Sequence, residues 1–262
     1  MEFFDSHAHL NLPEFGPDRS EALARARAAG VTRITNVGVD AASSRLARDL
    51  ARDEAGLLAS AALHPNYAAD LGEPEWVCVA ALLREGGFAA VGETGLDYYR
   101  DHAPPELQQD LFRRHLALAE ELSLPVIVHC RNAHADCRAV LAEEMPRRNL
   151  ADRVVLHCFS GTGEDARAYL ALGALLSFTG VLTFPNAHSA RAVAAGVPLA
   201  RTLAETDCPW LAPQARRGKR NEPAYVTHAV GALAGLHGVS VEEAARITTE
   251  NAVRFFAPGE QT

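Results

Sequence analysis

Short apolar runs alternate with longer amphipathic segments along nearly the whole chain, and this alternation limits the folds that the sequence can adopt. Strands separated by helices form parallel β-α-β units, and eight strands in 262 residues favour a closed (β/α)8 barrel over an open doubly wound sheet. The expected strands are residues 3–7, 32–37, 57–63, 88–92, 126–129, 154–157, 174–178 and 202–206. The expected helices include residues 17–29, 43–54, 73–85, 106–121 and 133–144. We therefore expect an α/β fold with one TIM-barrel domain over residues 1–262.

Histidines and acidic residues follow these apolar runs where the strands are expected to end. In a parallel barrel the carboxyl ends of all strands open on the same face, which is where active sites lie. His7 and His9 are two residues apart, and side chains at that spacing on a strand point to the same side. The residues at such positions are Asp5, His7, His9, His64, Glu93, His129, His157 and Asp207. Their recurrence on nearly every strand indicates a shared site.

Each of these residues also has a simpler interpretation when it is taken singly. An isolated His-x-His pair can be two polar loop residues, and Glu93 can cap the following helix. A single histidine such as His129 or His157 at the end of an apolar run is more often a hydrogen-bonded core residue. Their matched placement on adjacent strands favours a common role. A carboxylate at Asp207 would be costly unless it binds a metal ion, a proton or a basic group.

Six of these side chains have the chemistry of a metal site. They are His7, His9, Glu93, His129, His157 and Asp207. Mixed imidazole and carboxylate ligands suit zinc, manganese or a similar ion, and magnesium at the oxygen-rich side. Six ligands are too many for one tetrahedral ion, and they suit two divalent ions bridged by Glu93 and a water. We expect this water to become a hydroxide that attacks an electrophilic centre, with Asp207 as a ligand that also accepts the water's proton.

Charge and composition exclude several other functions. A net charge of −8 means that the surface as a whole does not attract nucleic acid, so a phosphate-bearing partner needs a local patch or a bound metal ion. The five cysteines show no C-x-x-C spacing, which argues against a disulfide framework and a zinc ribbon. No apolar stretch approaches the roughly 20 residues that span a bilayer, and the N-terminal segment lacks signal-peptide features. We therefore expect a cytoplasmic protein without membrane contact.

These motifs resemble the TatD-like metal-dependent deoxyribonucleases, within the wider amidohydrolase-type barrel hydrolases. The resemblance covers residues 4–256 and is carried, in order, by "DSHAHLN", "HP", "VGETGLDYY", "LPVIVHCRNA", "LHCFSG", "SFTGVLTF", "ETDCPWLAP", "RGKRNEPAYV" and "TTENAVRFF". It implies that one ion is surrounded by His7, His9, Glu93 and Asp207. It implies that a second ion is surrounded by Glu93, His129 and His157.

The resemblance has further implications for activity. It implies that His64 is an additional active-site histidine, which contacts the scissile phosphate or a water. It implies removal of nucleotides from the 3′ end of single-stranded DNA or of RNA, and in some members a role in oxidative DNA repair. Many two-metal barrels of this superfamily bridge their ions with a carboxylated lysine at the end of strand four. Lys219 is the only lysine here and lies after strand eight, so a carboxylate bridge through Glu93 is the consistent choice.

One segment of this acidic chain is strongly basic. Residues 214–223, "QARRGKRNEP", come directly after Asp207 and "CPWLAP" on the expected active face. A solvated charge run is the usual interpretation, but the position beside the predicted metal ions favours binding of substrate phosphates. The candidate phosphate-binding residues are Arg216, Arg217, Lys219 and Arg220, with Arg131 as a further candidate. Aromatic residues in neighbouring loops can stack on bases or fill the barrel mouth, and both interpretations stay open for Tyr98, Tyr99, Phe159 and Trp210.

Three functions are compatible with this site. A two-metal phosphodiesterase, acting as a 3′-5′ exodeoxyribonuclease on single-stranded DNA or other nucleic-acid ends, uses every unusual feature. An alternative keeps the two divalent ions (Mg, Mn or Zn) but hydrolyses an aminoacyl-tRNA ester, an amide or a lactone, and fold and ligands do not separate these reactions. A non-catalytic binding barrel would be indicated by a missing ligand, and none is missing. We favour the phosphodiesterase, with no obligate protein partner.

Overall fold

The computed structural model describes residues 1–256 and contains one eight-stranded parallel sheet in the order β1 to β8. Each strand pairs in parallel with the next strand along the chain. The strands are β1 (Phe3–Ala8), β2 (Val31–Val37), β3 (Leu57–Ala61), β4 (Ala90–Asp97), β5 (Val126–Arg131), β6 (Val154–Leu156), β7 (Leu175–Phe178) and β8 (Thr202–Ala204). The predicted TIM barrel is confirmed. Residues 257–262 of the predicted domain lie outside the described residues.

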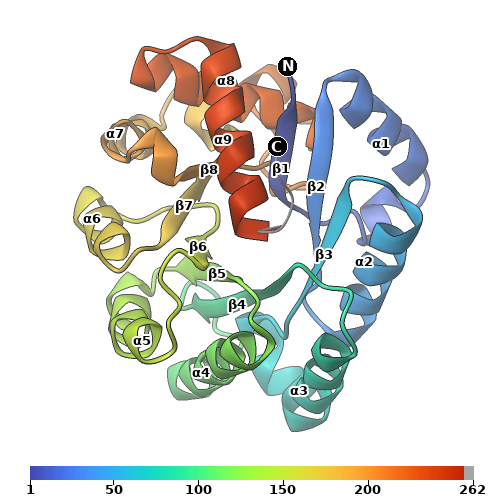
Figure 1. Ribbon diagram of the computed structural model, residues 1–262, viewed down its shortest axis with the longest axis vertical. Helices are drawn as coiled ribbons and strands as arrows, with labels where there is room; N and C mark the ends of the chain where they lie inside the picture. The colour runs from blue at the N-terminus through green and yellow to red at the C-terminus, as the bar shows by residue number, and fades with distance from the viewer. Residues whose placement is uncertain (257–262) are drawn as a thin grey trace.

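Helices surround the strands, and the last of them, α9, lies over one end of the barrel instead of in the outer ring, as Figure 1 shows. They are α1 (Arg19–Ala28), α2 (Ala41–Asp53), α3 (Ala68–Glu85), α4 (Pro105–Leu122), α5 (His134–Arg147), α6 (Gly163–Ala171), α7 (His188–Gly196), α8 (Val226–His237) and α9 (Val241–Phe256). Local sequence fixes several of their starts: the Asp40 side chain accepts the Ser43 N–H at the start of α2, and Thr162 caps α6 in the same way. Among the described residues, no helix has the length and apolar character needed to cross a membrane.

The first and last strands meet beside each other and close the barrel. The peptide N–H of His9 donates to the carbonyl of Cys208 at 2.9 Å, and the N–H of Asp207 donates to the carbonyl of His7 at 2.9 Å. The buried Asp5 carboxylate accepts both the N–H and the hydroxyl of Thr206, at 2.8 and 2.6 Å. These bonds hold the residues after β1 against the residues after β8.

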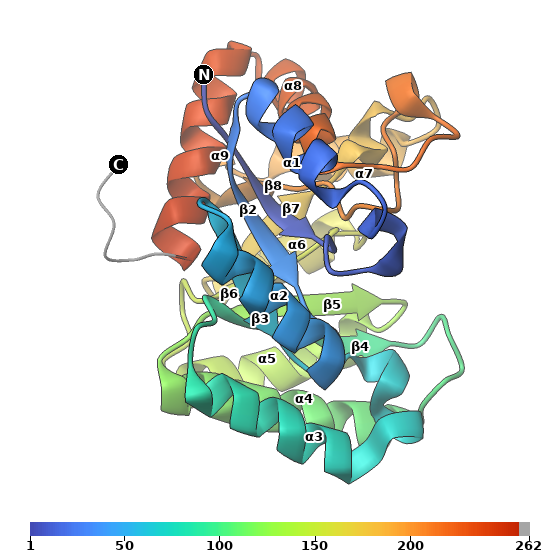
Figure 2. The ribbon, with the colours of Figure 1, turned by 90° about the vertical axis from the view of Figure 1, so that its right-hand side faces the viewer.

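The barrel interior is apolar, and α9 covers its amino-terminal end (Figure 2). Interior side chains from seven strands form one cluster with α9: Phe4, Val37, Ala90, Ile127, Val155, Leu175 and Leu203. The ring of Phe256 in α9 lies 5.6 Å from that of Phe4, so that this helix seals the end of the barrel. Asn251 of the same helix donates to the carbonyls of Leu199 and Thr202 and so ties α9 to the chain on either side of the start of β8. The polar cluster therefore lies at the opposite end of the strands.

β4 is longer than the sequence pattern predicts. It continues through Glu93 to Asp97 instead of ending at residue 92, and its pairing with β5 shifts register around Glu93. Gly95 has a φ of 135°, and a Cβ at this position would collide with the carbonyl oxygen of His129. Glycine therefore lets β4 approach β5 closely while the strand is bent. Glu93 projects from within a strand rather than from the loop after it.

β6 and β8 are shorter than predicted. They end at Leu156 and Ala204, so that His157 and Asp207 lie in the loops that follow. Cys158 and Asp207 have φ values of 42° and 55°, which turn the chain away from the strand direction. Both functional side chains still lie at the carboxyl end of the barrel, as predicted.

Candidate metal centre

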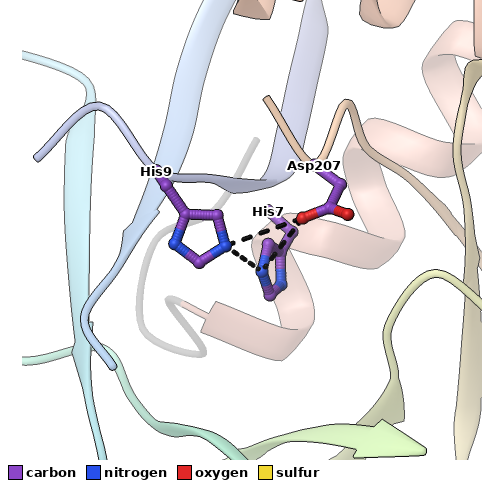
Figure 3. Close-up of side chains that lie close together, drawn as sticks. All are labelled: His7, His9 and Asp207. Atoms are coloured by element: carbon purple, nitrogen blue, oxygen red, sulfur yellow. Dashed lines mark hydrogen bonds and ion pairs between the residues drawn. The ribbon is translucent and has the colours of Figure 1, made fainter. Parts of the chain in front are cut away.

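The two histidines of the His-x-His pair converge at the end of β1. Their Nε2 atoms lie 3.1 Å apart, and Asp207 Oδ1 lies 3.8 Å from that of His7 and 3.6 Å from that of His9 (Figure 3). His9 Nδ1 lies 3.0 Å from the carbonyl oxygen of Val37, so it donates there and leaves Nε2 with a free lone pair. The bonds that close the barrel thus bring two imidazoles and one carboxylate to a single point.

Glu93 lies between two pairs of histidines and faces each pair with a different oxygen. Its Oε1 is 2.7 Å from His129 Nδ1 and 2.7 Å from His157 Nε2. Its Oε2 is 3.3 Å from His7 Nε2 and 3.7 Å from His9 Nε2. A carboxylate placed in this way can bridge two cations, each with its own nitrogen ligands. The structure brings all six predicted ligands together.

A second carboxylate lies behind each imidazole on the Oε1 side. Asp97 Oδ2 is 3.0 Å from His129 Nε2, and Glu205 Oε1 is 3.5 Å from His157 Nδ1. Such carboxylates orient the ring, fix its tautomer and raise the basicity of the nitrogen that faces the metal site. The sequence pattern misses Asp97 because it ends β4 too early. On a strand that reaches residue 97, positions four apart face the same side, and this signal would indicate Asp97.

His64 lies next to Glu93, after β3. Its Nε2 is 3.3 Å from Glu93 Oε1, and its Nδ1 accepts the N–H of Asn66 at 3.1 Å. Because Nδ1 accepts, the neutral ring carries its proton on Nε2, which faces the cluster. Burial lowers the pKa of His64 and favours this neutral form. The predicted additional histidine therefore offers a hydrogen-bond donor to the cluster.

The carboxylates of the cluster are held in the ionised form. Burial by itself raises the pKa of Glu93, but the charge of His157 and the hydrogen bonds from His129 and His157 outweigh it and keep that pKa well below its usual range. Burial likewise raises the pKa of Asp207, and its interaction with His9 reverses this effect, so the pKa is lowered. Negative charge is therefore concentrated at the centre of the site.

Two imidazoles take up the protons that balance this charge. Burial lowers the pKa of His129, but the hydrogen bonds to Asp97 and Glu93 outweigh it and raise the pKa to about 9. The pKa of His157 is also raised, because Glu93 and Glu205 overcome its burial. A divalent cation would replace these protons, because metal ions bind imidazole in its neutral form and release protons on binding.

The donor set of the cluster fits divalent cations. His7 Nε2 faces three acceptors, the lone pair of His9 Nε2 and one oxygen each of Glu93 and Asp207, and a single proton can satisfy only one of them. A cation can satisfy all of them together. Three groups have ligand atoms within 4.8 Å of one another: His7 with His9 and Asp207; His64 with Glu93 and His129; and His7 with His157 and Glu205. In the first group, His7 and His9 face Glu93 Oε2. In the second group, His64 and His129 face Glu93 Oε1.

Among the predicted phosphate-binding residues, most of which lie in the basic loop (residues 214–223), Arg220 is already paired with an acidic side chain. Its guanidinium contacts both oxygens of Asp18, at 2.6 and 2.8 Å, and lies 4.3 Å from the ring centre of Phe15. It also donates to the carbonyl of Glu14 at 2.6 Å. Arg220 therefore anchors the basic loop to the segment before α1.

The other four predicted cations are exposed: Arg131, Arg216, Arg217 and Lys219. Arg131 ends β5, two residues after His129, and its guanidinium carbon lies 3.8 Å from the ring centre of Tyr99. Arg217 lies 4.8 Å from the ring centre of Phe184. These contacts orient the guanidinium groups and leave their N–H edges accessible to an anion.

The open question about the loop aromatics is resolved for two of them. Phe159 is buried, and its ring packs edge-on against Tyr169 and Phe178, with ring centres 6.1 and 6.3 Å away. Tyr98 is half-buried and donates its hydroxyl to Asp136 at 2.9 Å. Both are packing residues.

Known proteins resemble this chain in both sequence and fold. Residues 4–257 match the family described as TatD related DNase. The chain is 40% identical over 253 residues to an uncharacterized metal-dependent hydrolase, YabD, of Bacillus subtilis, covering 97% of this chain and 98% of that protein. It is 36% identical over 259 residues to the 3′-5′ ssDNA/RNA exonuclease TatD of Erwinia tasmaniensis, covering 97% and 99%. The crystal structure of YJJV, a TatD homolog from Escherichia coli K12, superposes with a TM-score of 0.90 at 31% identity, covering 97% of each chain.

Proposed function

This chain belongs to the TatD-related DNase family of metal-dependent hydrolases, and from this premise we propose that it removes nucleotides from the 3′ end of single-stranded DNA or RNA. The observation that carries the proposal is that the two carboxylate oxygens of Glu93 face two different pairs of histidines. One oxygen faces His129 and His157, and the other faces His7 and His9. The 3′-5′ direction and the single-stranded substrate are supported by the relative from Erwinia tasmaniensis, which is named for that activity.

The proposal assigns the six predicted ligands to two divalent ions. His7, His9, Asp207 and Glu93 would hold one ion, and His129, His157 and Glu93 would hold the other. When bound, such ions lower the pKa of water and neutralise charge on the phosphate. Magnesium, manganese and zinc all accept this mixture of nitrogen and oxygen ligands.

Two side chains at the mouth of the cluster act on the substrate. Asp207 is ionised and its side chain is 14% exposed, so it can accept the proton of the attacking water. The water oxygen forms a bond to phosphorus, and the bond from phosphorus to the O3′ of the preceding nucleotide breaks. The freed O3′ takes a proton from solvent. His64 donates its Nε2 proton in a hydrogen bond to a phosphate oxygen and so holds the reacting group in place.

A labelled oligonucleotide tests this function directly. Metal-stripped protein is incubated with a 5′-labelled single strand, and magnesium, manganese and zinc are then added in separate reactions. A ladder of products shortened from the 3′ end is expected only when metal is present, and a 3′-blocked strand should resist. If the strand stays intact with every metal while an aminoacyl-tRNA ester, an amide or a lactone is hydrolysed, the proposed bond is wrong.

Glu93→Gln tests the bridge within that function. Removing one negative charge between two cations is expected to lower the rate to about 1% of wild type or less, and to lower the bound metal measured by elemental analysis. Glu85→Gln is the matched control, because Glu85 is an exposed residue that pairs with Arg48 at the surface. Full activity and full metal content in Glu93→Gln would contradict the bridging role.

A further inference from the structure

Three aromatic side chains are exposed in the described part of the chain, and each one lies beside the candidate metal centre. They are Tyr67, Tyr99 and Trp210, with exposed fractions of 41%, 59% and 49%. The other aromatic rings are buried or half-buried. Large apolar rings left in water at one place on a surface mark a binding site more often than chance exposure does.

Trp210 flanks the first half of the centre. Its ring meets the imidazole of His9 edge-on, with ring centres 5.1 Å apart, and half of its surface remains free. Asn221 fixes this position, because its side-chain amide donates to the carbonyls of Thr206 and Trp210 at 2.8 and 2.6 Å. The N–H of Asn221 also donates to the carbonyl of Pro209 at 3.0 Å. Asn221 therefore ties the later part of the basic loop to the backbone that carries Trp210.

Tyr67 and Tyr99 flank the second half of the centre, after β3 and β4. The ring of Tyr67 lies 6.0 Å from the imidazole of His64. The N–H of Tyr99 donates to Asp97, the carboxylate that contacts His129, and Arg131 stacks on the ring of Tyr99. Tyr99 is therefore held next to an exposed cation.

We infer that Tyr67, Tyr99 and Trp210 form a stacking rim for the unpaired bases of a single strand, whose terminal phosphate lies at the metal centre. The inference rests on the proposed function and specifies how its substrate is recognised. Every base offers a flat face, so stacking accepts any sequence, whereas bases in a duplex already stack on one another. Cations beside the rings match the phosphates that separate successive bases.

An equilibrium binding assay on metal-stripped protein in EDTA tests the rim without cleavage. The probe is a fluorescein-labelled oligothymidylate, and the comparison probe carries tetrahydrofuran in place of the last three bases at its 3′ end. Tyr67→Ala, Tyr99→Ala and Trp210→Ala should each weaken binding of oligothymidylate about fivefold or more. Their effect on the base-free probe should stay below about twofold, because there is no base to lose.

Conservative and remote variants separate stacking from damage to the fold. Tyr99→Phe and Trp210→Phe keep a flat ring and should restore most of the affinity. Val77→Ala removes an exposed apolar side chain from α3 and should bind both probes like wild type. Equal losses on the two probes, or duplex binding as tight as single-strand binding, would overturn the rim. Base-dependent losses in a protein that shortens no oligonucleotide with any metal would support the rim and refute the proposed exonuclease.

Discussion

Replacement of Asp97 by asparagine should disable half of the metal centre while keeping its shape. Asp97 Oδ2 lies 3.0 Å from His129 Nε2, and Asp97 Oδ1 accepts the N–H groups of Tyr99 and Arg100 at 3.0 and 3.1 Å. Asparagine has the same size, but only one end of its amide can accept a hydrogen bond. The amide oxygen of the variant can therefore accept either from His129 or from the two backbone N–H groups, but not from both.

Each of the two orientations of the asparagine amide is unfavourable, either for metal binding or for the stability of the fold. If the amide oxygen keeps the two backbone N–H groups, the amide nitrogen faces His129 Nε2, which must then accept. The proton of the neutral ring moves to Nδ1, the atom 2.7 Å from Glu93, and the lone pair for a metal ion is lost. If the amide turns over, the N–H groups of Tyr99 and Arg100 lose their acceptor at about 1–3 kcal/mol each. We expect metal affinity to fall about 10- to 100-fold, or about 1.4–2.7 kcal/mol.

Competition with a chromophoric chelator measures this loss on metal-stripped protein, and thermal unfolding shows whether the fold is kept. Asp136→Asn is the matched control, because Asp136 accepts hydrogen bonds from Tyr98 and Gln109. The control should bind metal like wild type. An Asp97→Asn protein with unchanged metal affinity would refute the reasoning, as would an equal loss in the control.

The remaining predictions concern the basic loop, a buried histidine and the helix that seals the barrel. Arg217→Ala combined with Lys219→Ala should raise KM for oligonucleotides more than it lowers kcat, and should reduce the slope of log affinity against log salt by about 1.4; an unchanged slope would exclude phosphate contacts there. Burial lowers the pKa of His115 to about 3, so the unfolded chain takes up a proton below pH 6.5 that the folded protein does not. The stabilisation present above pH 6.5 is therefore lost as pH falls towards 3, and the contribution of His115 alone to the free energy of unfolding should be about 2 kcal/mol smaller at pH 5 than at pH 7.5. Denaturant unfolding at the two pH values should show a pH dependence that is smaller by this amount in His115→Gln than in wild type. Phe256→Ala should cost about 3–4 kcal/mol in urea unfolding and leave metal affinity unchanged.

The order and type of the predicted elements could be read from the sequence because the alternation of apolar runs with amphipathic segments is strong. Strand ends were harder to place, since they depend on tertiary contacts. β4 continues to Asp97 because Gly95 allows close pairing with β5, and no local periodicity reports that contact. β8 stops at Ala204 because the chain turns towards β1, a partner distant in sequence.

The candidate ligands could be recognised because imidazoles and carboxylates recur at strand ends. Their supporting residues could not, because support depends on contacts between strands. Glu205 sits behind His157 only because β8 and the loop after β6 are neighbours. In the sequence, nothing distinguishes Arg220 from the other cations of its loop. Its partner Asp18 lies about two hundred residues earlier, so only the folded structure reveals the pairing. Charge in a sequence segment does not reveal which cations are already neutralised.

The hydrogen bonds that hold the residues after β1 against the residues after β8 have a consequence for the growing polypeptide. During synthesis His7 and His9 emerge before the acid that completes their half of the cluster, which follows about two hundred residues later in the chain. A prematurely terminated product that stops before β8 therefore carries the imidazoles without Asp207 and Glu205. Hydrolytic capacity that depends on this cluster can therefore arise only after the residues that follow β8 have been synthesised and have folded against β1.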